Sequence, residues 1–361
     1  MKPARSFTGE IVFTSVLLLG VFIIRIIASN RFWVEEGYTF GLYQGLSVIF
    51  RYTWGWVPFS IGDLLYIGLF IWLVVKLLKF IKILARKKFS RASFLLGGFR
   101  YFRLAIWIYL IFNIFWGLNY NRPGIAYQLA LDVKKEPVDQ LRKLTLLLLD
   151  STNACSGFSE WKKNLTTKQI FSGADLAYQQ VSPEYPFLKY QPASVKKSLF
   201  GVIGNYMGYS GYFNPFTGEA QVNHTVPIAV LPFVTCHEIA HQLGYAKENE
   251  ANFVGFLAAE KSGQTAFRYS AYFEMFLYAN SELYLFDTAA YRANMRALAP
   301  EAKADLVELR AFRIKYEGPV DKAVSAFYDR YLKLNQQPSG EKSYSRVIMW
   351  LLAYYRKEGK I

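Results

Sequence analysis

Residues 236–253 read CHEIAHQLGYAKENEANF, and this stretch decides how the C-terminal part of the chain is built. It holds two of the three histidines of the chain, His237 and His241, with Glu238 beside the first. On an α-helix, residues four positions apart project from one face, a turn apart. The spacing therefore predicts a helix that presents both imidazoles to one point.

The ends of this helix are marked in the sequence. Pro232 suits the first turn of a helix, and Gly244 can adopt the left-handed backbone that closes one. We predict the helix over about 232–243. A second helix follows the short turn, in the stretch EANFVGFLAAE (250–260).

The His-Glu-x-x-His spacing lets two nitrogens bind one tetrahedral zinc ion. Glu238 is not expected to bind the metal. It would take a proton from a zinc-bound water that attacks a carbonyl, and then give that proton to the leaving amine. A zinc ion that keeps one position open for water needs a third protein ligand. Glu248 and Glu250 are the candidates, and about 200° separates them on a helix, so only one can face the zinc.

The motif and the later helix Glu248-x-x-Ala251-Asn252 together resemble the gluzincin zinc peptidases. Those enzymes take a third-ligand glutamate from a second helix, commonly in Glu-x-x-Ala-Asp or Glu-x-x-Ala-Asn. The resemblance implies that Glu248 is the ligand and that Asn252, one turn on, supports a ligating histidine. Glu250 would then cap or solvate the helix start. The link between the two helices is much shorter than in most gluzincins, so Glu250 stays the alternative ligand.

Two other protein families can be compared with this sequence. Lys247 occupies the position of the third histidine of a metzincin, which excludes that class. Nearly the whole chain also resembles an uncharacterised bacterial family of membrane proteins, in which three N-terminal spans precede a domain with this motif and a segment like NPFTGEAQVN (214–223). That resemblance implies the architecture and no activity.

Two further groups of residues could act beside such a zinc. An edge strand could pair with extended substrate backbone, although a hairpin that merely packs over the helix is the alternative. The candidate edge strand is Glu219, Ala220, Gln221, Val222 and Asn223. A hydrogen-bond donor could stabilise the transition state. The candidate donors are His224, Tyr269 and Tyr344.

The N-terminal third predicts three membrane spans. Apolar runs at about 8–28, 60–82 and 102–120 are each long enough to cross a bilayer. Residues 1–103 hold 14 Lys and Arg against 4 Asp and Glu, so most of the net charge of +15 flanks these runs. Positive charge around apolar spans indicates a lipid bilayer as partner and not a nucleic acid.

The same charges predict an orientation. Residues 85–103 hold six basic residues and no acidic one, whereas residues 29–59, the loop between the first two spans, hold two of each. The positive-inside rule then places 85–103 and the N-terminus in the cytoplasm. Three spans put everything after Tyr120 outside, so we expect a multi-pass protein of the bacterial cytoplasmic (inner) membrane with an extracytoplasmic C-terminal domain.

The expected fold is mainly α. Residues 1–120 form the membrane region, and residues 121–361 form a mostly helical, zincin-like α+β domain with a short β-hairpin or edge strand beside the motif helix. The two cysteines, Cys155 and Cys236, are too few for a disulfide framework, and their pairing stays open.

Together these features predict a membrane-anchored zinc metallopeptidase that binds one zinc ion and hydrolyses peptide bonds in a peptide or protein substrate. One alternative is a non-catalytic membrane protein whose structural or vestigial zinc site serves as an interaction module. Another is a zinc amidase, because the same chemistry fits other carbonyl substrates. A closed structural zinc site usually has four protein ligands, and no fourth is evident in the motif.

Overall fold

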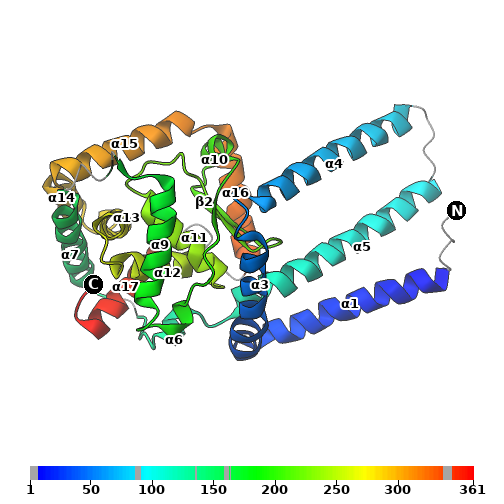
Figure 1. Cartoon of the computed structure of the whole chain (residues 1–361), viewed down its shortest axis with the longest axis horizontal. Coiled ribbons are helices and arrows are strands. Elements are labelled where there is room, and N and C mark those ends of the chain that lie inside the picture. The colour runs from blue at the N-terminus through cyan, green and yellow to red at the C-terminus, as the bar shows by residue number, and fades with distance from the viewer. Residues whose placement is uncertain (1–6, 86–90, 135, 158–161, 163, 336–343) are drawn as a thin grey trace.

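The computed structural model describes residues 7–85, 91–134, 136–157, 162, 164–335 and 344–361. Three long helices extend from one side of a folded, mostly helical part, and the first of them begins at the end far from it (Figure 1). Helix makes up 75% of the structure and strand 3%. The expectation of a mainly α protein is therefore confirmed.

The three long helices are the apolar segments expected to span a membrane. They are α1 (Phe7–Ser29), α4 (Ile61–Ala85) and α5 (Arg91–Phe115). Each is long and apolar enough to cross a bilayer, over Gly9–Ser29, Ile61–Ile83 and Gly97–Phe115. Their side chains are largely exposed, which suits helices that face lipid.

The third of these helices begins and ends earlier than the expected 102–120. α5 stops at Phe115 because the backbone of Trp116 leaves the helical region, and a 3-10 helix, η2 (Gly117–Asn121), follows. Arg103 therefore lies within a helix and not in a loop, and it pairs with Glu10 of α1. Pairing lowers the cost of holding such charges near lipid.

Residues 31–59, expected as part of an open loop between the first two spans, are mostly helical and pack against the folded part. We call them the connector. It consists of α2 (Arg31–Trp33), a π-helix η1 (Val34–Tyr43), α3 (Gln44–Trp54) and a turn that leads into α4. The hydrophobic pattern did not predict this packing, because much of the surface that the connector buries is polar.

The core is built around α11 (Leu231–Gln242) and α12 (Glu248–Glu260). Every residue of α12 from Asn249 to Ala259 is buried. Gly255 lets the two helices touch, because a Cβ there would lie 3.0 Å from the backbone nitrogen of His237. The helices packed around this pair are α9 (Thr167–Val181), α13 (Thr265–Tyr284) and α17 (Tyr344–Glu358). α7 (Val138–Ser156) packs on the outer side of α13 and also contacts α17.

Shorter and outer helices complete the folded part. They are α6 (Ile125–Gln128), η3 (Pro186–Leu188), α10 (Gly201–Met207), α14 (Thr288–Ala297), α15 (Pro300–Tyr316) and α16 (Pro319–Leu334). α16 lies beside the junction from which the long helices leave (Figure 1). The cysteines Cys155 and Cys236 are separate, buried thiols.

A three-stranded sheet packs on α11, in the order β1 (Val195–Lys197), β3 (Glu219–Val222), β2 (Gly211–Asn214). β1 runs parallel to β3, and β2 runs antiparallel to it, which confirms the expected hairpin. The expectation that Glu219–Asn223 forms an edge strand is wrong, because β3 is the middle strand. The other side of β3 is paired with β1. The sequence did not indicate β1, because three residues are too few to show the alternation of a strand. Among the described residues β2 pairs only with β3, so β2 is an edge strand.

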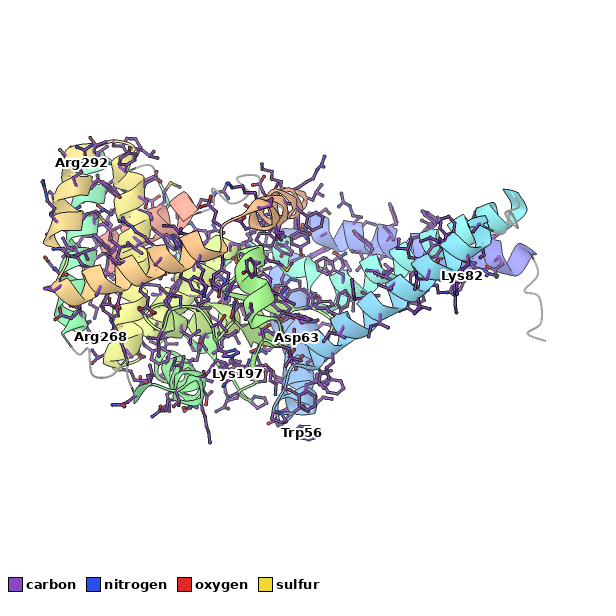
Figure 2. The ribbon with its side chains drawn as sticks, turned by 90° about the horizontal axis from the view of Figure 1, so that it is seen from above. Trp56, Asp63, Lys82, Lys197, Arg268 and Arg292 are labelled. Atoms are coloured by element: carbon purple, nitrogen blue, oxygen red, sulfur yellow. The ribbon has the colours of Figure 1, made fainter. Side chains whose placement is uncertain are left out.

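The second long helix begins directly on this sheet. The backbone N–H groups of Ile61 and Gly62 donate to the Glu219 carboxylate, at 3.1 and 2.6 Å. A carboxylate at a helix N-terminus satisfies free N–H groups and stabilises the helix dipole. The hydroxyl of Tyr212 on β2 donates to Asp63 in the same turn. Asp63 lies where α4 meets the folded part (Figure 2).

Candidate metal centre

Both motif histidines and the first residue of α12 meet at one point. His237 Nε2 lies 3.3 Å from Glu248 Oε2, and His241 Nε2 lies 3.6 Å from Glu248 Oε1. The imidazole rings are nearly perpendicular, with 4.7 Å between their centroids. Three donor atoms, one from each residue, all lie within 4.8 Å of one another. Such a cluster brings two nitrogens and an oxygen to a single metal position.

A hydrogen bond behind His241 fixes the orientation of its imidazole. His241 Nδ1 lies 2.7 Å from the carbonyl oxygen of Tyr245, so a proton on Nδ1 leaves the Nε2 lone pair free to bind a metal. His237 Nδ1 is buried without a hydrogen-bond partner among the described residues. Burial lowers the pKa of the His237 imidazole, but Glu248, Glu238 and, to a smaller extent, Asn252 raise it above its usual value. The structure thus places Asn252 beside a histidine of the cluster.

The pKa shifts of Glu248 and His241 favour the protonation states that bind a metal. Burial alone would raise the pKa of Glu248, but its hydrogen bond to His237 and the charges of both imidazoles lower it to about 2. Burial lowers the pKa of His241 to about 4. A charged carboxylate and a neutral imidazole are the forms that bind zinc. The donor set therefore fits a zinc ion with three protein ligands.

Glu238 lies beside the cluster and is 3% exposed. Its carboxylate packs against Gly211 of β2, where a Cβ would come within 2.5 Å of Glu238 Oε1. Its other oxygen, Oε2, is buried and has no hydrogen-bond partner among the described residues. Burial raises the pKa of Glu238 to about 8. An unpartnered carboxylate oxygen in this position can accept a proton from a water molecule.

Glu250 points elsewhere, although it is only two residues from Glu248. Its side chain is 1% exposed and lies 3.3 Å from Lys247 Nζ, against Gly124. The expectation that Glu250 is solvated at the helix start is therefore wrong. A buried carboxylate needs a cationic partner, and Lys247 supplies it.

The turn between α11 and α12 is held by the chain that leaves the membrane. Gly244 has a φ of +91°, as expected for the residue that ends the motif helix. Its carbonyl accepts from Arg122 Nη1 at 3.2 Å. Arg122 Nε lies 3.0 Å from Glu35 of the connector, and both side chains are buried. This ion pair supports the backbone that sets the spacing between His241 and Glu248.

The connector also binds the end of the motif helix. Tyr43 and Ser47 donate to the carbonyl oxygen of Gln242, at 3.1 and 2.8 Å. The last carbonyls of a helix have no partner within the helix, so they need donors from elsewhere when they are buried. Here those donors come from the segment between the first two long helices.

The cluster opens into a cleft of about 930 Å³. Its walls come from α10, β2, α15 and α16 and from the residues that follow α5. Many of the lining side chains are aromatic, and Glu274 and Arg313 also line the cleft. A cleft of this size accepts a segment of several residues or a comparable small molecule.

Tyr328 of α16 is a site residue that the sequence did not indicate. Its hydroxyl donates to Glu248 Oε1 at 2.5 Å. Its ring stacks on Tyr331, whose hydroxyl lies 3.3 Å from that of Tyr120. The residue is 38% exposed, but its hydroxyl is buried beside Glu248, which raises the pKa of Tyr328 well above its usual value and keeps the hydroxyl protonated. The chain has 26 tyrosines, and only the fold singles out this one.

Two of the three donors expected from the sequence, Tyr269 and His224, are not brought to the cluster. Tyr269 is buried in the core, where its hydroxyl donates to Asp305 at 2.5 Å. His224 is exposed in the loop between β3 and α11 and does not line the cleft. α17 begins at Tyr344, whose side chain lies outside the described residues.

A protein-family model with the description "Protein of unknown function (DUF3810)" matches residues 38–352. The match takes in most of the connector, α4, α5 and every residue of the cluster. No curated protein and no solved structure matches the chain.

The ligand set can be tested by changing one carboxylate at a time in the purified full-length chain. We expect Glu248→Gln to lower zinc affinity by about 100-fold or more, because it removes a charged ligand. Glu250→Gln is the matched control on the same helix and should change the affinity no more than about threefold. Competition with a chromophoric zinc chelator measures the zinc affinity of each variant. The opposite ranking of the two variants would remove Glu248 from the ligand set.

Proposed function

The chain belongs to the DUF3810 family, whose description gives no function. We propose that it is a membrane-anchored zinc metallopeptidase. One observation carries the proposal. The three donor atoms of His237, His241 and Glu248 meet at the wall of a cleft, and beside them lies Glu238, whose Oε2 has no partner among the described residues. This arrangement resembles that of gluzincins and supports a zincin-like fold.

His237, His241 and Glu248 would hold the metal. When bound there, zinc supplies the Lewis acidity that makes a substrate carbonyl more electrophilic and a water molecule more acidic. Three protein ligands leave room for exchange at the metal, whereas a structural site is usually closed by four. Within the described residues the cluster has three, which favours a catalytic site over a structural one.

Glu238 would do the proton transfers. Its Oε2 accepts a proton from the attacking water, and the same oxygen then returns the proton to the leaving amine. Gly211 leaves room for the Glu238 carboxylate, because a side chain at this position of β2 would displace it. Tyr328 would give up its hydrogen bond to Glu248 and donate the same hydroxyl hydrogen to the carbonyl oxygen as negative charge develops there.

β2 would hold the substrate. It lies in the cleft wall beside Glu238, and among the described residues one side of it has no strand partner. An extended peptide can add to such an edge through backbone hydrogen bonds. This role for β2 favours a peptide over other carbonyl substrates, because a small amide has no extended backbone to pair.

We further propose that the folded part lies outside the cytoplasm of a bacterium. The support is the run of basic residues between the second and third spans, which the positive-inside rule places in the cytoplasm. The ends of α1 and α5 and the start of α4 all meet the folded part, which supports the proposal that three crossings separate it from the basic segment.

The catalytic role of Glu238 predicts a specific pair of results. In the full-length chain in detergent, Glu238→Gln should lower the cleavage of a mixed-sequence peptide library by about 10² to 10⁴-fold, because it removes the general base. Zinc content should not change. Glu308→Gln, on the exposed face of α15, is the control. Zinc binding without any cleavage that depends on Glu238 would instead indicate a non-catalytic metal site.

The proposed role of Tyr328 predicts that its replacement lowers kcat. Tyr328→Phe should lower kcat by about 10² to 10³-fold, because it removes a donor to the transition state, and KM should change little. Tyr284→Phe, an exposed tyrosine of α13, is the control. Steady-state kinetics and zinc titration separate the two possible roles. A loss of zinc affinity with unchanged kcat would mean that Tyr328 only orients Glu248.

The orientation is tested with single cysteines in intact cells. Leu285→Cys, on an exposed position after α13, should react with a membrane-impermeant maleimide, whereas Lys87→Cys in the basic segment should react only after the cells are opened. The native cysteines are buried and should stay unlabelled. The reverse pattern would place the folded part in the cytoplasm.

A further inference from the structure

We propose that the cleft takes polypeptides anchored in the same membrane and that it acts on them within about ten residues of their own span, a stretch of roughly 35 Å when extended. This inference rests on the proposed peptidase function and adds a substrate class to it. It is carried by where the cluster and β2 lie relative to the ends of the spans.

The metal cluster lies at the end of the third span. The apolar segment of α5 ends at Phe115, and the next residue, Trp116, lines the cleft. The ring of Trp116 is 6.0 Å from that of His241 and 4.3 Å from that of Phe213 on β2, measured between centroids. One aromatic side chain therefore separates the last residue of a span from a residue of the cluster.

β2 lies at the start of the second span. Tyr212 stacks on Tyr66 of α4, with 6.2 Å between ring centroids, and its hydroxyl donates to Asp63. The neighbouring strand β3 carries Glu219, which binds the first N–H groups of α4. A peptide paired with β2 would therefore lie at the level where both α4 and α5 leave the folded part.

Large apolar side chains are exposed around this junction. Trp56, in the turn before α4, is 80% exposed and projects from the junction (Figure 2). Other large exposed side chains lie next to the ends of α1 and α4 and on α10; they are Phe32, Trp33, Phe59, Leu199, Val202 and Ile203. Leu199 contacts the first turn of α4 through its backbone N–H, which donates to Asp63. Exposed aromatic residues beside spans mark the headgroup level of a bilayer.

These three features place the cleft beside the bilayer surface. A polypeptide anchored in the same membrane presents the residues next to its span at that height. A dissolved peptide must first reach the surface, whereas the anchored chain is held there at a high effective concentration. The geometry therefore favours juxtamembrane segments over both dissolved peptides and distant loops.

The test uses the full-length chain in phosphatidylcholine and phosphatidylethanolamine vesicles. The probe is a single-span polypeptide whose exposed part repeats one ten-residue sequence six times, so that every distance from the membrane offers the same sites. A matched probe has the same repeats and no span. Mass spectrometry maps each cut, and Glu238→Gln identifies cuts that depend on the site.

We expect cuts to concentrate in the first repeat next to the span, at least tenfold above the outer repeats, and the span-free probe to be cut at least tenfold more slowly. Cuts spread evenly over the repeats, cuts confined to the outer repeats, or equal cleavage of both probes would each overturn the inference and leave the peptidase function standing.

A binding measurement separates failure of the inference from failure of the peptidase function. Ser210→Cys places an exposed thiol beside β2, in the non-cleaving Glu238→Gln background. Probes with one cysteine in the first, third or sixth repeat are then oxidised with it in the vesicles. A disulfide mainly with the first repeat supports the inference even where nothing is cut. Equal or outer-repeat crosslinking overturns it.

Discussion

The backbone between the motif helix and the helix that follows it is the constraint on which the site depends. Only five residues, 243–247, separate α11 from α12. This short link lets Glu248 reach back to both histidines, but it buries helix-end carbonyls that need donors. Arg122, paired with Glu35, and the hydroxyls of the connector supply them. Losing one partner of such a buried ion pair costs about 3–5 kcal/mol.

This constraint joins the membrane region to the site. Glu35 lies between the first two spans, and Arg122 lies just after the third. The start of α4 is bound by Glu219 of the sheet that packs on the motif helix. The long helices therefore do more than anchor a separate domain. Their ends help to build the folded part, and the positions of the cluster and of β2 follow from that.

Much of this could be predicted from residue spacing. The i, i+4 histidines, the helix closed by Gly244, the hairpin and the three apolar helices are local features, and each has a signature within a short window. The failures were not local. β3 is a middle strand and not an edge strand because β1, a three-residue strand from an earlier segment, pairs with its second side. The connector was treated as a loop because its helices bury polar groups, which carry no hydrophobic period. Tyr328 comes from a helix about 80 residues beyond Glu248.

The sequence by itself determined which residue types could bind a metal and where a membrane could be crossed, because helical periodicity and apolar length are properties of neighbouring residues. It left Glu248 and Glu250 as alternatives. Only the tertiary structure decided their places. Glu250 lies against Lys247 and Gly124, whereas Glu248 lies between the two imidazoles. Partners for buried charges are chosen by packing between distant segments, and no local pattern records that choice.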